Sequence, residues 1–267
     1  MKSASSVGII SQKFLPAQIY TYFTKNICSQ MGKSRKLSDR LNFAHTYKIN
    51  WKQSTRCRNS SNLESCVKKF QNLDALFQRR IQRKFTKSQA TKPTDIICPA
   101  ECFARKVSAN RNFKIKGVNY SLEKLLQLQE QSQEQSQQQS TVYIFRLAPE
   151  HYHRIHSPTA SKIVDIKEAG GNYHSVNPIM LHSSPVLQEN YRKIITFENG
   201  VYLVAVGATC VGSVHLTVNV GTTVTHGQDM GTFGFGGSCL VLVVPTVYSS
   251  QSTVSAQEKH LMPGVLL

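Results

Sequence analysis

The chain has 267 residues, enough for one large domain or two small ones, and 40% of them are hydrophobic, sufficient for a core. Lys and Arg number 32 against 15 Asp and Glu, and this net charge of +17 attracts nucleic acid or an anionic membrane. The sequence shows no stacking motif or zinc knuckle for nucleic acid, and its apolar runs stop short of the roughly 18 residues that span a bilayer. We therefore expect no nucleic-acid partner and only peripheral contact with a membrane.

The N-terminal region predicts a basic amphipathic helix. Five apolar residues recur at every fourth position and form one stripe on a helix: Leu15, Ile19, Phe23, Ile27 and Met31. Lysines flank the stripe, so the helix suits a membrane interface, although a surface helix packed on its own domain has the same pattern. The lack of acids before Asp39 fits a mitochondrial presequence weakly.

Further helices are expected up to about residue 90. One contains Leu37, Leu41 and Ala44, and a later one runs from Leu63 to Ile81. Four basic residues crowd the end of the later helix and could meet phosphate head groups, although charged runs usually form a solvated face: Arg79, Arg80, Arg83 and Lys84. We predict a basic helical, membrane-associating region over residues 1–90.

Beyond Pro93 the pattern changes to short strands bounded by turn residues: Ile96–Ile97, Phe113–Val118, Val142–Leu147 and Ile194–Phe197. Val214–Val220 alternates apolar and polar residues, and Cys239–Val244 is continuously apolar, as in a strand covered on both faces. The fold class is therefore α+β, with a mainly antiparallel sandwich-like or barrel-like β core over residues 91–248. A glutamine-rich stretch, 126–140, predicts an exposed insertion, and 249–267 predicts a loosely ordered polar tail.

The seven cysteines are odd in number and irregularly spaced, which implies no disulfide framework and favours a reducing compartment. Cys98 and Cys102 are the closest pair, but no second pair follows at the spacing of a zinc site.

The segment Gly231–Cys239 places two glycines directly before Ser238 and an apolar strand directly after it. Because glycine leaves the neighbouring carbonyl open, the hydroxyl of Ser238 could attack the carbonyl of Gly237 and form an ester. Elimination of that ester would break the chain and convert Ser238 to dehydroalanine and then to a pyruvoyl group. By itself the segment favours a simple glycine-rich turn before a core strand.

A second segment, Arg146–Pro158, resembles the histidine-rich signature of phosphatidylserine decarboxylases, and Phe235–Ser238 resembles the self-cleavage motif of that family. Further segments match in the family's order: Gly117–Leu122, Ser175–Asn177, Val206–Thr209, Val211–Ser213 and Gly227–Gly231. The resemblance extends from about Phe14 to about Val244.

The resemblance implies cleavage between Gly237 and Ser238 into a β chain, 1–237, and an α chain, 238–267, which stay together as a heterodimer. Ser238 would become a pyruvoyl group whose ketone forms a Schiff base with phosphatidylserine. Loss of carbon dioxide and hydrolysis would then give phosphatidylethanolamine, with no metal or diffusible cofactor. The enzyme would be peripheral to an anionic membrane, with the mitochondrial inner membrane favoured over endomembranes and homo-oligomerisation left open.

The resemblance also implies residue roles. His156 stands at the position of the base in an Asp-His-Ser triad, and Glu101 stands at the position of the aspartate. His153 stands at a second family histidine, to which we assign protonation of the decarboxylated product. Tyr152 and Arg154, in the same segment, are candidates for substrate binding.

Departures from the family pattern leave two alternatives open. Glu101 replaces aspartate, and Cys102, His151 and Cys239 replace glycine, aspartate and threonine. A degenerate member that binds anionic lipid without cleaving itself would tolerate these changes. A zinc site formed by the three histidines of the segment is the other alternative: His151, His153 and His156.

Overall fold

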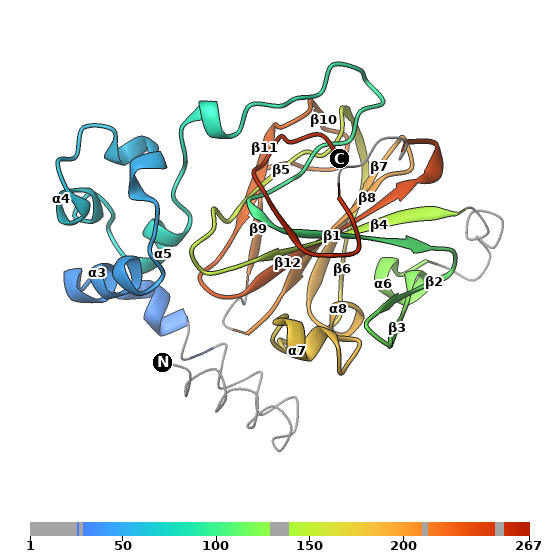
Figure 1. Cartoon of the computed structure of the whole chain (residues 1–267), viewed down its shortest axis with the longest axis horizontal. Coiled ribbons are helices and arrows are strands. Elements are labelled where there is room, and N and C mark those ends of the chain that lie inside the picture. Colours follow the sequence, from blue (N-terminus) through green and yellow to red (C-terminus); the bar gives the residue numbers. More distant parts are fainter. Residues whose placement is uncertain (1–25, 27–28, 129–138, 210–212, 249–253) are drawn as a thin grey trace.

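The computed structural model describes residues 26, 29–128, 139–209, 213–248 and 254–267. A small helical part, drawn in blue, lies beside a larger β core (Figure 1). Among the described helices, none combines the length and apolarity needed to cross a bilayer. Most of the predicted N-terminal amphipathic helix and of the glutamine-rich insertion fall outside the described residues.

The helical part consists of short helices around its own core. Asn62 and Asn72 cap α4 and α5 by accepting the N–H groups of Ser65 and Ala75, each at 2.8 Å. Aromatic and aliphatic side chains from α3, α4 and α5 bury together, so this part has a separate hydrophobic cluster. Its elements are α3 (Leu37–Thr46), η1 (Trp51–Gln53), η2 (Thr55–Cys57), α4 (Leu63–Val67), α5 (Leu73–Phe77) and η3 (Arg83–Phe85).

A disulfide joins Cys57 of η2 to Cys66 of α4, and both cysteines are buried. The sequence implied no disulfide framework, so this single pair was not predicted. Neither spacing nor number revealed the pair, because the two cysteines meet only when the intervening polar segment folds back on itself.

The β core contains an eight-stranded, fully antiparallel sheet in the order β10-β6-β7-β8-β12-β4-β1-β13. A three-stranded sheet, β5-β11-β9, and a hairpin, β2-β3, complete the strands. This arrangement confirms the predicted mainly antiparallel core. The strands are β1 (Cys102–Ala109), β2 (Asn112–Ile115), β3 (Val118–Ser121), β4 (Ser140–Leu147), β5 (Arg154–His156), β6 (Ser161–Ala169), β7 (Arg192–Phe197), β8 (Tyr202–Gly207), β9 (Val214–Leu216), β10 (Thr223–Val224), β11 (Asp229–Phe233), β12 (Ser238–Pro245) and β13 (Lys259–Leu261).

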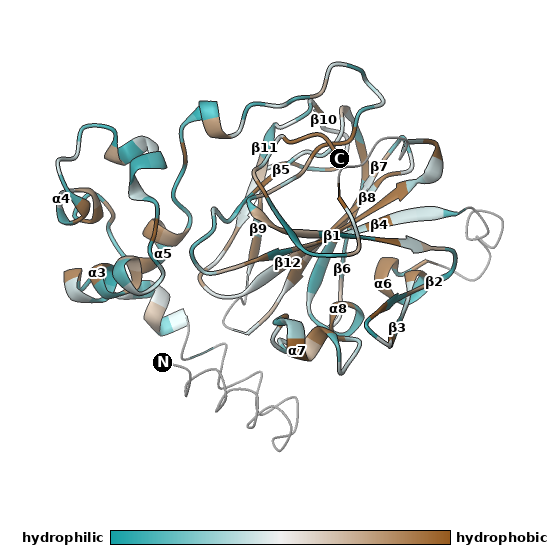
Figure 2. Ribbon diagram, viewed as in Figure 1, coloured by the Kyte–Doolittle hydropathy of each residue, from teal (hydrophilic) through white to brown (hydrophobic). Residues whose placement is uncertain are grey.

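The large sheet is buried on both faces around β12, whose residues from Ser238 to Val244 are all buried. Figure 2 shows the hydropathy of this and the neighbouring strands in the view of Figure 1. On one face, Leu240 packs with Ile155 and Phe233 from the three-stranded sheet. On the other face, Cys239 packs with side chains of α6 (Leu122–Leu126), α7 (Pro178–Leu181) and α8 (Val186–Glu189). Because strand residues alternate between faces, Ser238 points to the same side as Leu240, toward the three-stranded sheet.

Four strand-level expectations need correction. The expected strand Phe113–Val118 is divided between β2 and β3 by a turn at residues 116–117, and Ile97 forms only an isolated bridge, to Leu266. The alternating segment from Val214 forms a strand only to Leu216, because the chain turns at Asn219–Thr222, where Thr222 N–H donates to Asn219 O at 3.1 Å. The C-terminal tail is not loose over residues 254–267: β13 pairs with β1, and apolar residues of this segment enter the core, namely Val254, Leu261 and Leu267.

Candidate self-processing site

Ser238 is the first residue of β12 and lies between two neighbouring strands, opposite Leu147 of β4 and Gly207 of β8. Its side chain is fully buried, and its Oγ has no hydrogen-bond partner in the described part of the chain. A buried hydroxyl without a partner is costly in a folded protein and points to a functional role.

The loop before Ser238, residues 234–237, which we call the cleavage loop, joins β11 to β12. Gly236 has φ of +139°, a conformation that side chains resist, whereas Gly237 needs no such conformation. A Cβ on Gly237 would make only ordinary contacts, the nearest at 3.6 Å from Thr209 O. In the loop, the positive φ that favours glycine is therefore found at Gly236 and not at Gly237.

His156 is held by two hydrogen bonds, neither of them to Ser238 or Glu101. Its Nδ1 lies 2.8 Å from the carbonyl oxygen of Gly227, and its Nε2 lies 3.1 Å from the hydroxyl of Tyr152. A carbonyl can only accept, so Nδ1 carries the proton and Nε2 keeps its lone pair. Burial lowers the pKa of His156, which keeps the ring neutral.

His153 is arranged in the same way. Its Nδ1 donates to the carbonyl of His151 at 2.8 Å, and its ring packs on Phe77 of α5 with centroids 3.9 Å apart. Nε2 is buried without a partner among the described residues, and burial lowers the pKa of His153 well below its usual value. Next to it, the N–H of Phe233 donates to His153 O at 3.1 Å, which ties the histidine segment to the strand before the cleavage loop.

Glu101 does not contact His156; instead it accepts the N–H of Tyr152 at 2.9 Å. Its other oxygen lies 3.5 Å from Nε2 of His260 on β13. The triad acid expected from the resemblance is thus not in place, and the Gly227 carbonyl occupies its position on the histidine.

The zinc alternative based on three histidines is not supported, because the described structure does not bring the ring nitrogens of His151, His153 and His156 together as one group. Over the described residues, the one group with the proximity of a metal site is Glu101, His151 and His260, whose ligand atoms lie within 4.8 Å of one another. Nδ1 of His151 accepts the N–H of Ala148 at 3.1 Å, so the proton sits on Nε2. In that tautomer neither ring nitrogen of His151 has a free lone pair for a cation, because Nδ1 accepts a hydrogen bond and Nε2 carries the proton.

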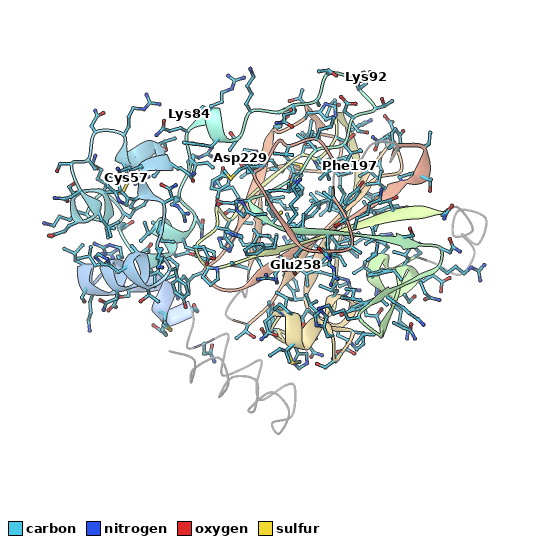
Figure 3. All side chains as sticks on the ribbon, in the orientation of Figure 1. Cys57, Lys84, Lys92, Phe197, Asp229 and Glu258 are labelled. Carbon is cyan, nitrogen blue, oxygen red and sulfur yellow. A yellow bond between two sulfur atoms is a disulfide. The ribbon has the colours of Figure 1, made fainter. Side chains whose placement is uncertain are left out.

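Two arginines near the histidine segment differ in their surroundings. Arg154 donates both bonds of a bidentate pair to Asp229, at 2.7 and 2.8 Å, and Asp229 also pairs with Arg80 of the helical segment at 2.8 Å. Asp229 lies on the side of the core that faces the helical part (Figure 3). Arg79 is buried and donates to Glu150 O at 2.8 Å, but its Nε and one terminal nitrogen have no partner in the described structure.

Burial lowers the pKa of Arg79 to about 10, so the guanidinium stays charged at neutral pH. Sequence reasoning treated the run from Arg79 to Lys84 as a solvated face, and this holds for Arg80 but not for Arg79. The pattern of basic residues offers no signal to separate them, because only packing against the β core buries one of them.

Comparison with known proteins decides the family. A sequence model described as "Phosphatidylserine decarboxylase" matches residues 73–264, which include every residue of the site. The chain belongs to the phosphatidylserine decarboxylase family.

Similar curated proteins are named as proenzymes of this decarboxylase. The proenzyme of Clostridium novyi is 30% identical over 251 residues, covering 90% of this chain and 79% of the relative. The proenzyme of Anoxybacillus flavithermus is 30% identical over 214 residues, 78% of this chain and 76% of the relative. Proenzyme 2 of Komagataella phaffii is 35% identical over 162 residues, 58% of this chain, but the match spans only 16% of that longer protein.

Proposed function

We propose that this chain is a phosphatidylserine decarboxylase that cleaves itself after Gly237 and converts Ser238 to a pyruvoyl group. Family membership supports the reaction class. The observation that carries the proposal is the position of Ser238: a buried, unpartnered hydroxyl at the boundary between a glycine-rich loop and a fixed central strand.

In the proposed self-cleavage, Oγ of Ser238 attacks the carbonyl carbon of Gly237, and Nε2 of His156 takes the hydroxyl proton. The C–N bond breaks and leaves an ester and a free amine. Removal of the Cα proton of Ser238 then breaks the Cβ–O bond, so Gly237 departs as a carboxylate and residue 238 becomes dehydroalanine. Hydrolysis of its enamine releases ammonia and leaves the pyruvoyl group. To act as base, His156 must exchange its bond with Tyr152 for one with Ser238.

The pyruvoyl group supplies an electron sink for the loss of carbon dioxide. Residue 238 fits this role, since its side chain faces the apolar cluster that contains Ile155 and Phe233, which excludes water. We assign proton transfer to the substrate to Nε2 of His153, which has no hydrogen-bond partner among the described residues. Because Nδ1 holds the single proton of the neutral ring, Nε2 must first take up a proton before it can pass one to the substrate. Glu101 is assigned the positioning of the histidine segment through the N–H of Tyr152.

We propose that phosphatidylserine in an anionic membrane approaches from the basic helical side, with Tyr152 and Arg154 as substrate contacts. The mitochondrial inner membrane remains our first choice of compartment and an endomembrane the second. The two chains would stay together as a heterodimer, since β12 lies between β4 and β8, and Leu267 N–H donates to Ile96 O at 2.8 Å.

Intact mass spectrometry of the purified protein tests the proposal. We expect a large and a small chain, the small chain carrying the mass deficit of pyruvoyl relative to serine, and release of phosphatidylethanolamine from phosphatidylserine vesicles. Ser238→Ala should give a single chain and no product.

A single intact wild-type chain of 29.9 kDa that binds the vesicles would instead establish the degenerate, non-enzymatic member. The missing acid on Nδ1 of His156 is the observation that favours this alternative.

A further inference from the structure

The cleavage loop is attached to the helical part by a side chain. Phe235 leaves the β core and packs on the hydrophobic cluster of the helices. Its ring centroid lies 5.5 Å from that of Phe43 on α3 and 5.4 Å from that of Phe77 on α5, both in edge-on geometry. Aromatic pairs of this kind contribute roughly 0.5–1.5 kcal/mol beyond burial.

The backbone of the loop is attached at the same place. The N–H of Phe235 donates to Oδ1 of Asp74 at 2.9 Å, across 161 positions of sequence. The other carboxylate oxygen, Oδ2, accepts from Nε2 of Gln78 at 2.6 Å, which fixes the orientation of the carboxylate. The scissile bond follows two residues after this anchor.

A purely local role for Asp74 in helix α5 does not account for these contacts. The helix is already capped by Asn72, whose Oδ1 accepts the N–H of Ala75 at 2.8 Å. An acid in the first turn can favour the helix dipole, but that effect needs no bond to a distant loop. Both oxygens of Asp74 are instead committed, one within the helix and one to the loop.

We propose that Asp74 and Phe235 are positioning residues for self-cleavage, so that the folded helical part holds the Gly237 carbonyl where Ser238 can attack it. This inference rests on the proposed self-cleavage. Downstream of the bond, β12 is fixed by strands on both sides, so Ser238 has little freedom. Upstream, the anchor at Phe235 and the positive φ of Gly236 set the path of the loop. This path decides whether the carbonyl carbon of Gly237 comes within the roughly 3–3.5 Å of Ser238 Oγ that attack requires.

The test measures the rate at which the intact chain converts to two chains on denaturing gels after synthesis. Asp74→Leu keeps the approximate shape and removes the acceptor, and we expect it to slow cleavage by about tenfold to a hundredfold, as for a misplacement of about 1 Å. Asp74→Asn keeps an oxygen that can accept the Phe235 N–H, so it should cleave within about threefold of wild type.

Phe70→Leu is the matched control for a merely structural effect. Phe70 is 2% exposed in the same helical cluster, so the change weakens the helical part without touching the loop. A second readout in the uncleaved Ser238→Ala protein is hydrogen exchange at the amide of Phe235, which should be protected and should lose protection when Asp74→Leu is added.

The outcomes separate the two proposals. If wild type never cleaves, the proposed function and this inference fail together. If wild type cleaves and Asp74→Leu cleaves at the wild-type rate, only the positioning role is refuted. The same holds if Asp74→Leu and Phe70→Leu cleave at the same rate as each other. Slow cleavage by Asp74→Leu with rescue by Asp74→Asn supports it.

Discussion

Asp229 lies on β11, the strand before the cleavage loop. Its carboxylate pairs with Arg154 of the histidine segment and with Arg80 of the helical part. Arg154 contributes two short bonds and has only 9% of its side chain exposed, whereas Arg80 is 64% exposed. Removing one partner of a buried ion pair costs roughly 3–5 kcal/mol, because the other charge stays buried. An exposed pair contributes roughly 0–1 kcal/mol.

We therefore expect Asp229→Asn to lower the free energy of unfolding by about 3 kcal/mol, near the lower end of that range because the amide keeps one acceptor oxygen. Arg80→Gln should lower it by about 1 kcal/mol or less. Urea unfolding in the Ser238→Ala background measures both, because every molecule there is one intact chain.

Adding Arg154→Met to Asp229→Asn should restore part of the loss, since the buried guanidinium is then gone. The reasoning fails if Asp229→Asn and Arg80→Gln lower the free energy of unfolding by the same amount. It also fails if the loss in the double variant equals the sum of the losses caused by Asp229→Asn and Arg154→Met alone. Either result would mean that solvent screens the Arg154–Asp229 pair as it screens the exposed one.

Three further predictions concern pH, the disulfide and the acid. Burial lowers the pKa of His151 to about 3, against about 6.5 in the unfolded chain. As the pH falls below about 6.5 the unfolded chain therefore takes up the proton first, and the free energy of unfolding decreases. Urea unfolding at several pH values should show a smaller decrease for His151→Asn. Replacing Cys57 and Cys66 by serine should cost about 2–3 kcal/mol in urea unfolding, the value for a short closed loop, and added reductant should have no further effect on that variant. Glu101→Gln should slow self-cleavage by less than about tenfold on gels, whereas loss of roughly 10⁴-fold would show that Glu101 orients the base after all.

Local patterns predicted the elements whose stability is local or whose burial is continuous. The apolar run at Cys239–Val244 was sufficient to identify β12, and the apolar positions of Leu37 and Leu41 identified α3. The order of the C-terminal segment was not predicted because its short apolar runs show neither helical nor strand periodicity. Leu261 pairs with Cys102, and the N–H of Leu267 donates to Ile96 O at 2.8 Å, so both enter the core through contacts with distant chain that periodicity cannot show.

The motifs located the serine and the histidines but not their partners. Gly227 stands in a segment that matches the family, but the match does not reveal that its backbone carbonyl sets the tautomer of His156. Asp74 is one of few acids in a basic helical region, but an acid in a first helical turn is ordinarily explained by the dipole, as for Glu64 in α4. Its contact with the loop depends on packing between two parts of the chain.

The positions of flexible and fixed backbone indicate how the proposed self-cleavage would be confined to one peptide bond. Ser238 is paired on both sides within the large sheet, so movement on its side would break strand pairing. Gly236 can change conformation at little cost, but Phe235 before it is anchored in the helical part. Between this anchor and the fixed strand lie only two glycines, and the N–H of Gly237 is itself held by Thr209 O at 3.1 Å. The remaining freedom lies next to the bond between Gly237 and Ser238, so in the proposed reaction the Gly237 carbonyl is the group that turns toward the hydroxyl.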